Sequence, residues 1–154
     1  MDTLIIRAES PATPDVKALL QRHFDLMRST SPEESCHVMA PESLSEAGAT
    51  LLTARQGDSL LGVGALARIG PQDGELKSMH TAQAARGKGV ARQILVALLA
   101  LAREQGLTRV SLETGTADVF AAARGLYLAE GFEVCPPFGD YCLDPLSVFM
   151  TRSV

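Results

Sequence analysis

Cysteine is scarce in this 154-residue chain. Its three cysteines, Cys36, Cys135 and Cys142, are odd in number and show no CxxC spacing. This count and spacing exclude a disulfide framework and argue against a zinc site, so a reducing cytoplasm is the expected location. No histidine or aspartate is spaced to activate any of these thiols, which disfavours a covalent acyl-cysteine route.

Excess positive charge and long apolar runs are also missing. The net charge is −4 and the pI is about 5.3, whereas nucleic-acid binders are usually basic, so we expect no nucleic-acid partner. The longest apolar-rich run, residues 94–102, is too short to cross a bilayer, and the first ten residues lack the basic segment of a signal peptide. We therefore expect no membrane partner. The length and the 46% hydrophobic content predict one globular domain over residues 1–154.

Strand and helix patterns alternate along the chain. Strand patterns cover residues 3–8, two stretches between 48 and 70 joined by a hairpin at 56–59, and then 75–81, 108–115, 132–135 and 146–152. Helix patterns cover residues 13–28, 31–39, 90–105 and 118–131. A proline marks the start of each of the first two helices, and a glycine marks the end of each of the last two. The order β-α-α-β-β-β-α-β-α-β-β predicts a mixed α/β fold, with parallel strands in the unit spanning residues 75–114.

Residues 86–92 (RGKGVAR) place two glycines and three cations at the start of a helix pattern. The first N–H groups of a helix lack internal partners and carry the positive end of its dipole, and glycine lets a ligand approach the backbone closely. This combination suits a phosphate group. The alternative is an uncapped helix with solvated basic residues. Neither a P-loop nor a GxGxxG fingerprint fits, because GKG lacks the following Ser or Thr and Arg92 replaces the third glycine.

In this context residues 86–91 (RGKGVA) resemble the (Gln/Arg)-x-x-Gly-x-(Gly/Ala) motif of the GNAT superfamily, the acyl-CoA-dependent N-acetyltransferases. A strand pattern precedes the motif and a long helix follows it. Further on, residues 125–132 (GLYLAEGF) resemble the family's Leu-Tyr-x-x-x-Gly-Phe signature. The order and spacing cover about residues 60–135, and the β-α-α-β-β opening fits the remainder. The resemblance implies the GNAT fold, in which the sheet splits into a V between two central parallel strands.

The resemblance also implies acetyl-CoA as the acyl donor and no metal. In the family, strand backbone pairs with the pantetheine arm, the glycine turn takes the pyrophosphate, and a strand N–H donates to the thioester carbonyl. The residues thereby expected to bind the cofactor are Met79, His80, Thr81, Arg86, Gly87, Lys88, Gly89, Val90 and Ala91.

Two residues match catalytic positions of the family. The acceptor amine must lose a proton to become nucleophilic, and the leaving thiolate must gain one. Tyr127 matches the family's leaving-group acid, and Glu75 matches a strand glutamate that acts as base, often through water, in some members. The alternatives are a core tyrosine and a solvent-facing carboxylate. Phe120 stands where many relatives have an asparagine that contacts pantetheine, so the acceptor-side geometry is expected to differ.

Acceptor walls in the family come from the first two helices, their connector and the last hairpin. The residues expected there are Arg28, His37, Glu113, Asp140 and Tyr141. Asp140 and Tyr141 fit a cationic or hydroxylated acceptor, but they equally fit a turn cap and a packed ring. The leading function is acetyl transfer to an amine of a small molecule or peptide. The alternatives are a non-catalytic acyl-CoA-binding or regulatory module and, less favoured, a nucleotide-binding domain. We leave open whether the chain forms a homodimer.

Overall fold

The computed structural model of the protein describes residues 3–30 and 39–154. Its helices and strands follow the predicted mixed α/β order. They are β1 (Leu4–Ala8), α1 (Pro14–Thr30), α2 (Pro41–Glu46), β2 (Thr50–Gln56), β3 (Ser59–Arg68), β4 (Asp73–Thr81), α3 (Val90–Glu104), β5 (Arg109–Gly115), α4 (Ala121–Ala129), β6 (Glu133–Cys135) and β7 (Ser147–Ser153). Short 3₁₀ turns, η2 (Gln83–Ala85) and η3 (Asp118–Phe120), precede α3 and α4.

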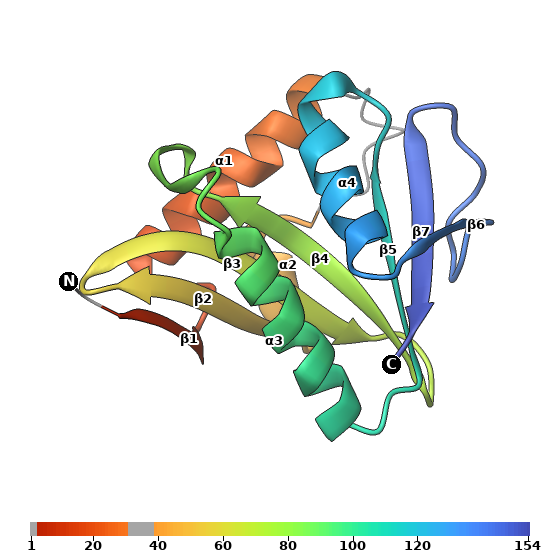
Figure 1. Cartoon of the computed structure of the whole chain (residues 1–154), viewed down its shortest axis with the longest axis horizontal. Coiled ribbons are helices and arrows are strands. Elements are labelled where there is room, and N and C mark those ends of the chain that lie inside the picture. Colours follow the sequence, from red (N-terminus) through yellow and green to blue (C-terminus); the bar gives the residue numbers. More distant parts are fainter. Residues whose placement is uncertain (1–2, 31–38) are drawn as a thin grey trace.

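In the described part of the chain, the strands form one seven-stranded sheet in the order β1-β2-β3-β4-β5-β7-β6. β4 and β5 pair in parallel, and every other neighbouring pair is antiparallel. The parallel pair confirms the predicted strand–helix–strand unit, because α3 connects these two strands. Figure 1 shows β4 and β5 at the centre of the sheet, close together at one end and apart at the other.

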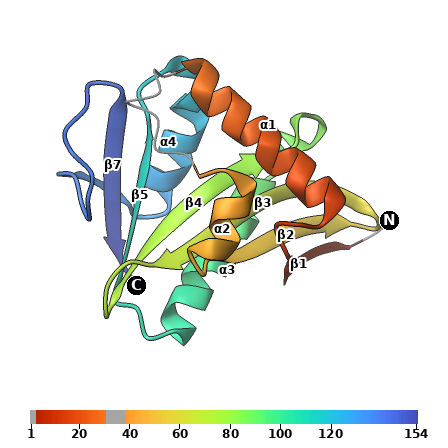
Figure 2. The same cartoon turned by 180° about the vertical axis from the view of Figure 1, so that it is seen from behind.

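Helices cover both faces of the sheet. α3 and α4 lie on the face shown in Figure 1, and α1 and α2 lie on the opposite face in Figure 2. α3 buries Ile94, Leu95 and Leu98 completely in the larger core cluster. α1 buries Val16 and Leu19 in a second cluster with side chains of β2 and β3. The larger cluster also takes in Leu76 of β4 and Leu112 of β5, so the central strands are packed against α3 on that face.

One helix prediction lies almost entirely outside the described residues, and another differs at its start. Of the helix expected over residues 31–39, residues 31–38 lie outside the described part of the chain. The second described helix, α2, begins at Pro41 and was not predicted, because its six residues are too few to show helical periodicity. The helix expected from residue 118 begins as a 3₁₀ turn, and α4 proper starts at Ala121. None of the helices in the described ranges is long and apolar enough to span a membrane.

A buried arginine ties the start of the chain to the sheet. Arg55 of β2 is 8% exposed. Its Nε donates to Oε2 of Glu9 at 2.7 Å, and its Nη1 donates to Oδ2 of Asp15 at 2.7 Å. The hydroxyl of Thr53 also donates to Glu9. The arginine outweighs the opposing effect of burial and lowers the pKa of Glu9 from its ordinary 4.5 to about 2.

Replacing Arg55 with methionine is expected to lower the free energy of unfolding by up to about 3–5 kcal/mol, because the largely buried carboxylate of Glu9 would keep, among the described residues, only the Thr53 hydroxyl and the exposed Arg7 as partners. Urea denaturation at neutral pH measures this. Since the folded-state pKa of Glu9 lies below its ordinary value, the wild type should lose this stabilisation as the pH falls from 4.5 through 2. The variant should lose much less over that range.

Arg109→Met is the control for Arg55→Met. Arg109 is an exposed arginine of β5 that hydrogen-bonds the hydroxyls of Thr151 and Ser153. Its replacement should cost less than about 1 kcal/mol. Equal destabilisation of the two variants would contradict the role given to Arg55.

Candidate active site

The central feature of the sheet is a split between its two parallel strands. β4 and β5 pair from Asp73 opposite Arg109 to Leu76 opposite Leu112, and their pairing ends there. Beyond this point β4 continues to Thr81 paired with β3, whereas β5 continues paired with β7. The strands therefore diverge (Figure 1). The β4–β5 ladder therefore does not extend to residues 77–81 of β4 or residues 113–115 of β5.

A β-bulge in β4 sits at the start of this split. The register with β3 changes between Val63 opposite His80 and Ala65 opposite Lys77, so two β4 residues oppose Gly64. Ser78, one of the two, has a φ of 57°, a left-handed conformation uncommon outside glycine. A side chain at position 64 would lie 2.4 Å from the sulfur of Met79. Glycine at this position therefore lets the bulge pack closely on β3.

The bulge determines which side chains share a face of β4. Leu76 and Met79 pack with the core under α3. His80 points to the other face, where its ring contacts His23 of α1. In a regular strand the side chain of residue 79, not residue 80, would share a face with that of residue 77. The bulge thus aligns Glu75, Lys77 and His80 along the face that α1 covers.

A cavity of about 710 Å³ runs through the split. Its walls come from both faces of the sheet: β4, β5 and the turn after β4, together with α1 on one side, α4 on the other, and Tyr141 of the β6–β7 connection. One end is lined by Arg86, Gly87 and Gly89, and Glu75 and Tyr127 line the same cavity. Residues far apart in the sequence therefore share one continuous space.

Both glycines of the glycine-rich turn adopt a left-handed backbone conformation. Gly87 and Gly89 both have a φ of 78°, and a Cβ at either would meet nothing within 4 Å. Gly89 is the N-cap of α3 and offers no side-chain cap bond. Arg86 and Arg92 line the cavity beside it. Lys88 is exposed and is not part of the cavity wall among the described residues.

Tyr127 projects from α4 into the cavity. It is 6% exposed, and its ring packs edge-on against Phe132 with centroids 5.7 Å apart. Burial raises the pKa of its hydroxyl well above the ordinary range, so the phenol stays protonated at neutral pH. Among the described residues, none accepts a hydrogen bond from this hydroxyl. Tyr127 therefore presents a protonated phenol to the cavity.

Glu75 lies at the centre of a polar network on the opposite face. It is 5% exposed. Its Oε2 accepts a hydrogen bond from the Tyr141 hydroxyl at 2.5 Å and lies 3.1 Å from Nζ of Lys77. Nζ of Lys77 also donates to the Tyr141 hydroxyl at 3.5 Å. Burial and then the nearby charges of Glu75 and Glu113 raise the pKa of Tyr141, which keeps its hydroxyl a donor to Glu75.

Aromatic packing holds Tyr141 in this position. Its ring lies 5.1 Å from that of Phe138 and 5.6 Å from that of Phe149, measured between centroids. Phe149 belongs to β7 and is almost fully buried. The connection between β6 and β7 thereby places a hydroxyl from residue 141 over a carboxylate from β4.

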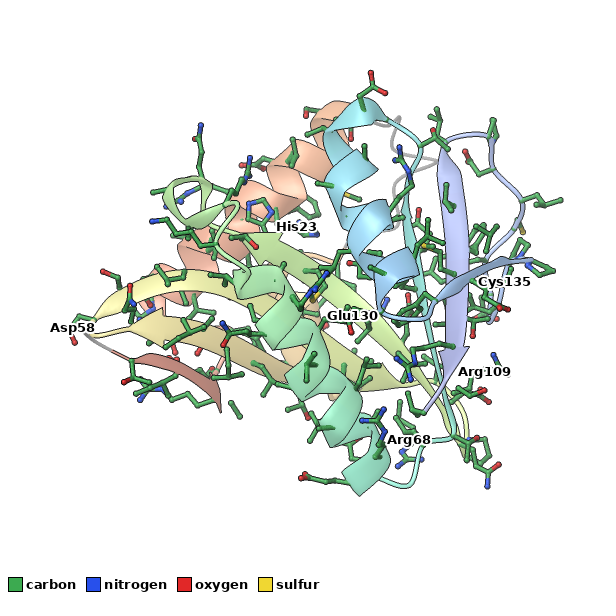
Figure 3. All side chains as sticks on the ribbon, in the orientation of Figure 1. His23, Asp58, Arg68, Arg109, Glu130 and Cys135 are labelled. Carbon is green, nitrogen blue, oxygen red and sulfur yellow. The ribbon has the colours of Figure 1, made fainter. Side chains whose placement is uncertain are left out.

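Two histidines close the α1 side of the cavity. Nδ1 of His23 lies 3.1 Å from Nδ1 of His80, with the rings inclined at 71°. Burial lowers the pKa of His23 to about 3, and burial with the charges of Arg86 and Arg22 lowers that of His80 to about 4. Both rings are therefore neutral at pH 7, and one donates to the other. Figure 3 shows His23 on α1, well apart from Arg109, which is the first residue of β5.

Phe120, for which the family resemblance led us to expect a different acceptor-side geometry, lies at the start of α4. It is 9% exposed, lies in η3 and lines the cavity. A Cβ added to Gly115, at the end of β5, would lie 2.4 Å from the Phe120 ring. Nη1 of Arg124 donates to the carbonyl oxygens of Gly115 and Ala117 at 2.7 and 3.0 Å. The ring and the guanidinium together fix the β5–α4 connection.

The structure does not gather every predicted acceptor residue. Glu113 and Tyr141 line the cavity, but Arg28 and Asp140 do not. Arg28 lies over the ring of Phe24 at the end of α1, and Asp140 is exposed. His37 falls outside the described residues. Neither Cys135, on the edge strand β6 (Figure 3), nor Cys142 lines the cavity.

Sequence reasoning missed His23 and Lys77. The alternation of Glu75 and Lys77 within one strand pattern was the available signal for Lys77, because such residues share a face. Nothing in the sequence pairs His23 with His80, since that contact depends on the packing of α1 over β4. No group of three or more possible metal-ligating side chains occurs among residues 3–30 and 39–154.

Comparisons with known proteins agree with this geometry. The sequence model of the Acetyltransferase (GNAT) family matches residues 14–132. The uncharacterized N-acetyltransferase YsnE of Bacillus subtilis (strain 168) is 42% identical over 139 residues, which are 90% of this chain and 92% of YsnE. The uncharacterized N-acetyltransferase YedL of Escherichia coli (strain K12) is 41% identical over 149 residues, 97% of this chain and 94% of YedL.

A solved structure shows the same fold. The crystal structure of a Bacillus subtilis acetyltransferase in complex with CoA superposes with a TM-score of 0.73 at 18% identity, and the match covers 99% of both chains. The chain described here belongs to the GNAT family of acetyltransferases. The family predicted from residues 86–91 and 125–132 is thus confirmed.

Proposed function

We propose that this acetyltransferase moves an acetyl group from acetyl-CoA directly to the amine of a small molecule or peptide. The observation that carries the proposal is the cavity through the β4–β5 split. It connects the glycine turn before α3 to Tyr127 and Glu75. A donor with a phosphate-bearing end and a thioester end fits such a path, and an amine can approach from the α1 face.

The donor would lie along the split. The uncapped start of α3 and the charges of Arg86 and Arg92 suit the pyrophosphate, and the open space at Gly87 and Gly89 lets the phosphates reach the backbone. The inner edge of β4 from Met79 to Thr81 would pair with the amides of the pantetheine arm. The Met79 or His80 N–H would donate to the thioester oxygen as charge develops there.

The two catalytic protons would move on opposite faces of the sheet. On the α1 face, Glu75 would accept a proton from the acceptor amine, directly or through a water, while Tyr141 holds the carboxylate in place. The amine would then attack the thioester carbon through the split. On the α4 face, Tyr127 would protonate the leaving sulfur. This arrangement keeps Tyr127 apart from Glu75, so the acid cannot transfer its proton directly to the base.

Acetyl-CoA is expected to raise the melting temperature of the protein, whereas ATP at the same concentration should not. Both carry phosphates, but only acetyl-CoA has an arm that can occupy the split. A ligand at 100 times its Kd adds about 2.7 kcal/mol to the free energy of unfolding. Thermal shift measures this, and release of free CoA with a panel of amines then tests transfer. An unchanged melting temperature with saturating acetyl-CoA would rule out the proposed donor site.

A further inference from the structure

The cavity contains an amine of the chain itself. Nζ of Lys77 lies 3.1 Å from Oε2 of Glu75, the carboxylate proposed to deprotonate the acceptor. Lys77 follows Leu76, the last β4 residue paired with β5, so its side chain starts where the split opens. Its side chain is only 15% exposed and lines the same cavity as Tyr127. Lys77 therefore occupies the position that an acceptor amine would take.

The other two lysines of the chain are placed differently. Lys17 lies on α1, where its Nζ is 3.6 Å from Oε1 of Glu42 and both side chains are more than half exposed. Lys88 is exposed on the glycine turn. Lys17 thus shares the lysine–glutamate contact of Lys77 but lies outside the described cavity wall. This contrast separates the effect of the cavity from that of an ion pair.

We propose that Lys77 is a self-acetylation site: in the absence of a better acceptor, the protein transfers the acetyl group of acetyl-CoA to its own Nζ of Lys77. The inference rests on the proposed function, because it uses the same donor and the same base. Contact with a base and confinement beside the thioester replace a bimolecular encounter by an intramolecular one. Acetyl-CoA supplies every atom that is added.

The ammonium of Lys77 gives one proton to Glu75, and the freed lone pair forms a C–N bond to the thioester carbonyl carbon. The C–S bond breaks, and Tyr127 gives its proton to the sulfur. The second proton of the nitrogen leaves as the amide forms and restores the Tyr127 phenol, and Glu75 releases the first proton to solvent, so one net proton is released. The products are Nε-acetyl-Lys77 and free CoA.

Acetylation would change the acceptor side of the cavity. The product is neutral, so the charge contact of Lys77 with Glu75 is lost. The added acetyl group occupies space that an external amine would need. The modification is therefore limited to one event per chain, and a chain modified at Lys77 should acetylate external amines more slowly than an unmodified one.

The test is incubation of the full chain with acetyl-CoA and no acceptor, followed by intact mass measurement and peptide mapping. We expect one acetyl group per chain, located at Lys77, with a first-order rate that does not depend on protein concentration. Glu75→Gln should slow the reaction by roughly 10²–10⁴-fold, the contribution of a positioned base. Lys17→Arg should leave it unchanged, and Lys77→Arg should abolish it. Melting temperatures verify that each variant is folded.

The outcomes separate this proposal from the proposed function. Acetyl groups spread equally over the three lysines, or a rate unaffected by Glu75→Gln, would mean chemical acetylation by acetyl-CoA and overturn the proposal. An unmodified Lys77 after incubation with acetyl-CoA and no acceptor, in a protein that does turn over external amines, would also overturn it, while leaving the proposed function intact. Failure of both self-acetylation and external transfer, with acetyl-CoA bound, would reject the proposed function as well.

Discussion

Replacing Tyr127 with phenylalanine is expected to slow acetyl transfer by roughly 10²–10⁴-fold, the contribution of a positioned general acid. The Kd for acetyl-CoA should hardly change, because the hydroxyl is needed only when charge appears on the leaving sulfur, and ground-state acetyl-CoA carries no such charge. The structure keeps this phenol protonated by burial and places it in the cavity wall. The edge-on contact with Phe132 needs only the ring, so phenylalanine preserves the packing.

Two measurements on the Tyr127 variant distinguish catalysis from packing. They are the rate constant with the best acceptor amine and the Kd for acetyl-CoA. If the hydroxyl were merely structural, its removal would leave turnover almost normal, and stability would change little because no described residue accepts a hydrogen bond from it. A rate within about threefold of wild type, less than about 1 kcal/mol on the barrier, would remove Tyr127 as the acid.

The second large effect is expected at the glycine turn. Gly89→Val should abolish detectable acetyl-CoA binding while most of the fold is retained. Gly89 has a φ of 78°, where a β-branched residue is strongly disfavoured. Its Cβ would point into open space, which is the space proposed for the pyrophosphate. Isothermal titration with acetyl-CoA measures the loss.

Gly106→Val provides a matched control for Gly89→Val. Gly106 follows the other end of α3 with a φ of 76°, and a Cβ there also meets nothing within 4 Å. The backbone strain should therefore be similar in the two variants, so their losses in melting temperature should be comparable. Only Gly89→Val should lose its affinity for acetyl-CoA. Normal affinity in that variant, or equal loss of affinity in both, would show that the turn does not hold the phosphates.

Local sequence patterns were enough to predict most of the fold. The proline and glycine signals at the helix ends, the hairpin at residues 56–59 and the alternating strands gave the order of elements, because each depends on neighbours in sequence. α2 escaped prediction since six residues are too few for a periodic pattern. The motif around Gly89 was recognisable because one short segment makes the whole turn.

The acceptor side of the cavity could not be predicted in the same way, because it depends on contacts between residues far apart in the sequence and on an irregular strand. Ser78 gives no sign that it adopts a left-handed conformation, yet that bulge decides that His80 faces α1. Tyr141 reaches Glu75 across the sheet, a contact between residues far apart in the chain. Arg28 and Asp140 were predicted from their positions in the sequence alone, and neither is among the described residues that line the cavity.

The contact between Phe120 and Gly115 restricts the order in which this site can change over generations. With the ring in place, any side chain at position 115 would overlap it, since even a Cβ would lie 2.4 Å away. A smaller side chain must therefore replace Phe120 before any residue larger than glycine can be accepted at position 115. In the reverse direction, a lineage with asparagine at 120 can acquire phenylalanine only where glycine is already present at 115. The two positions should thus vary together among relatives, with glycine accompanying the large ring.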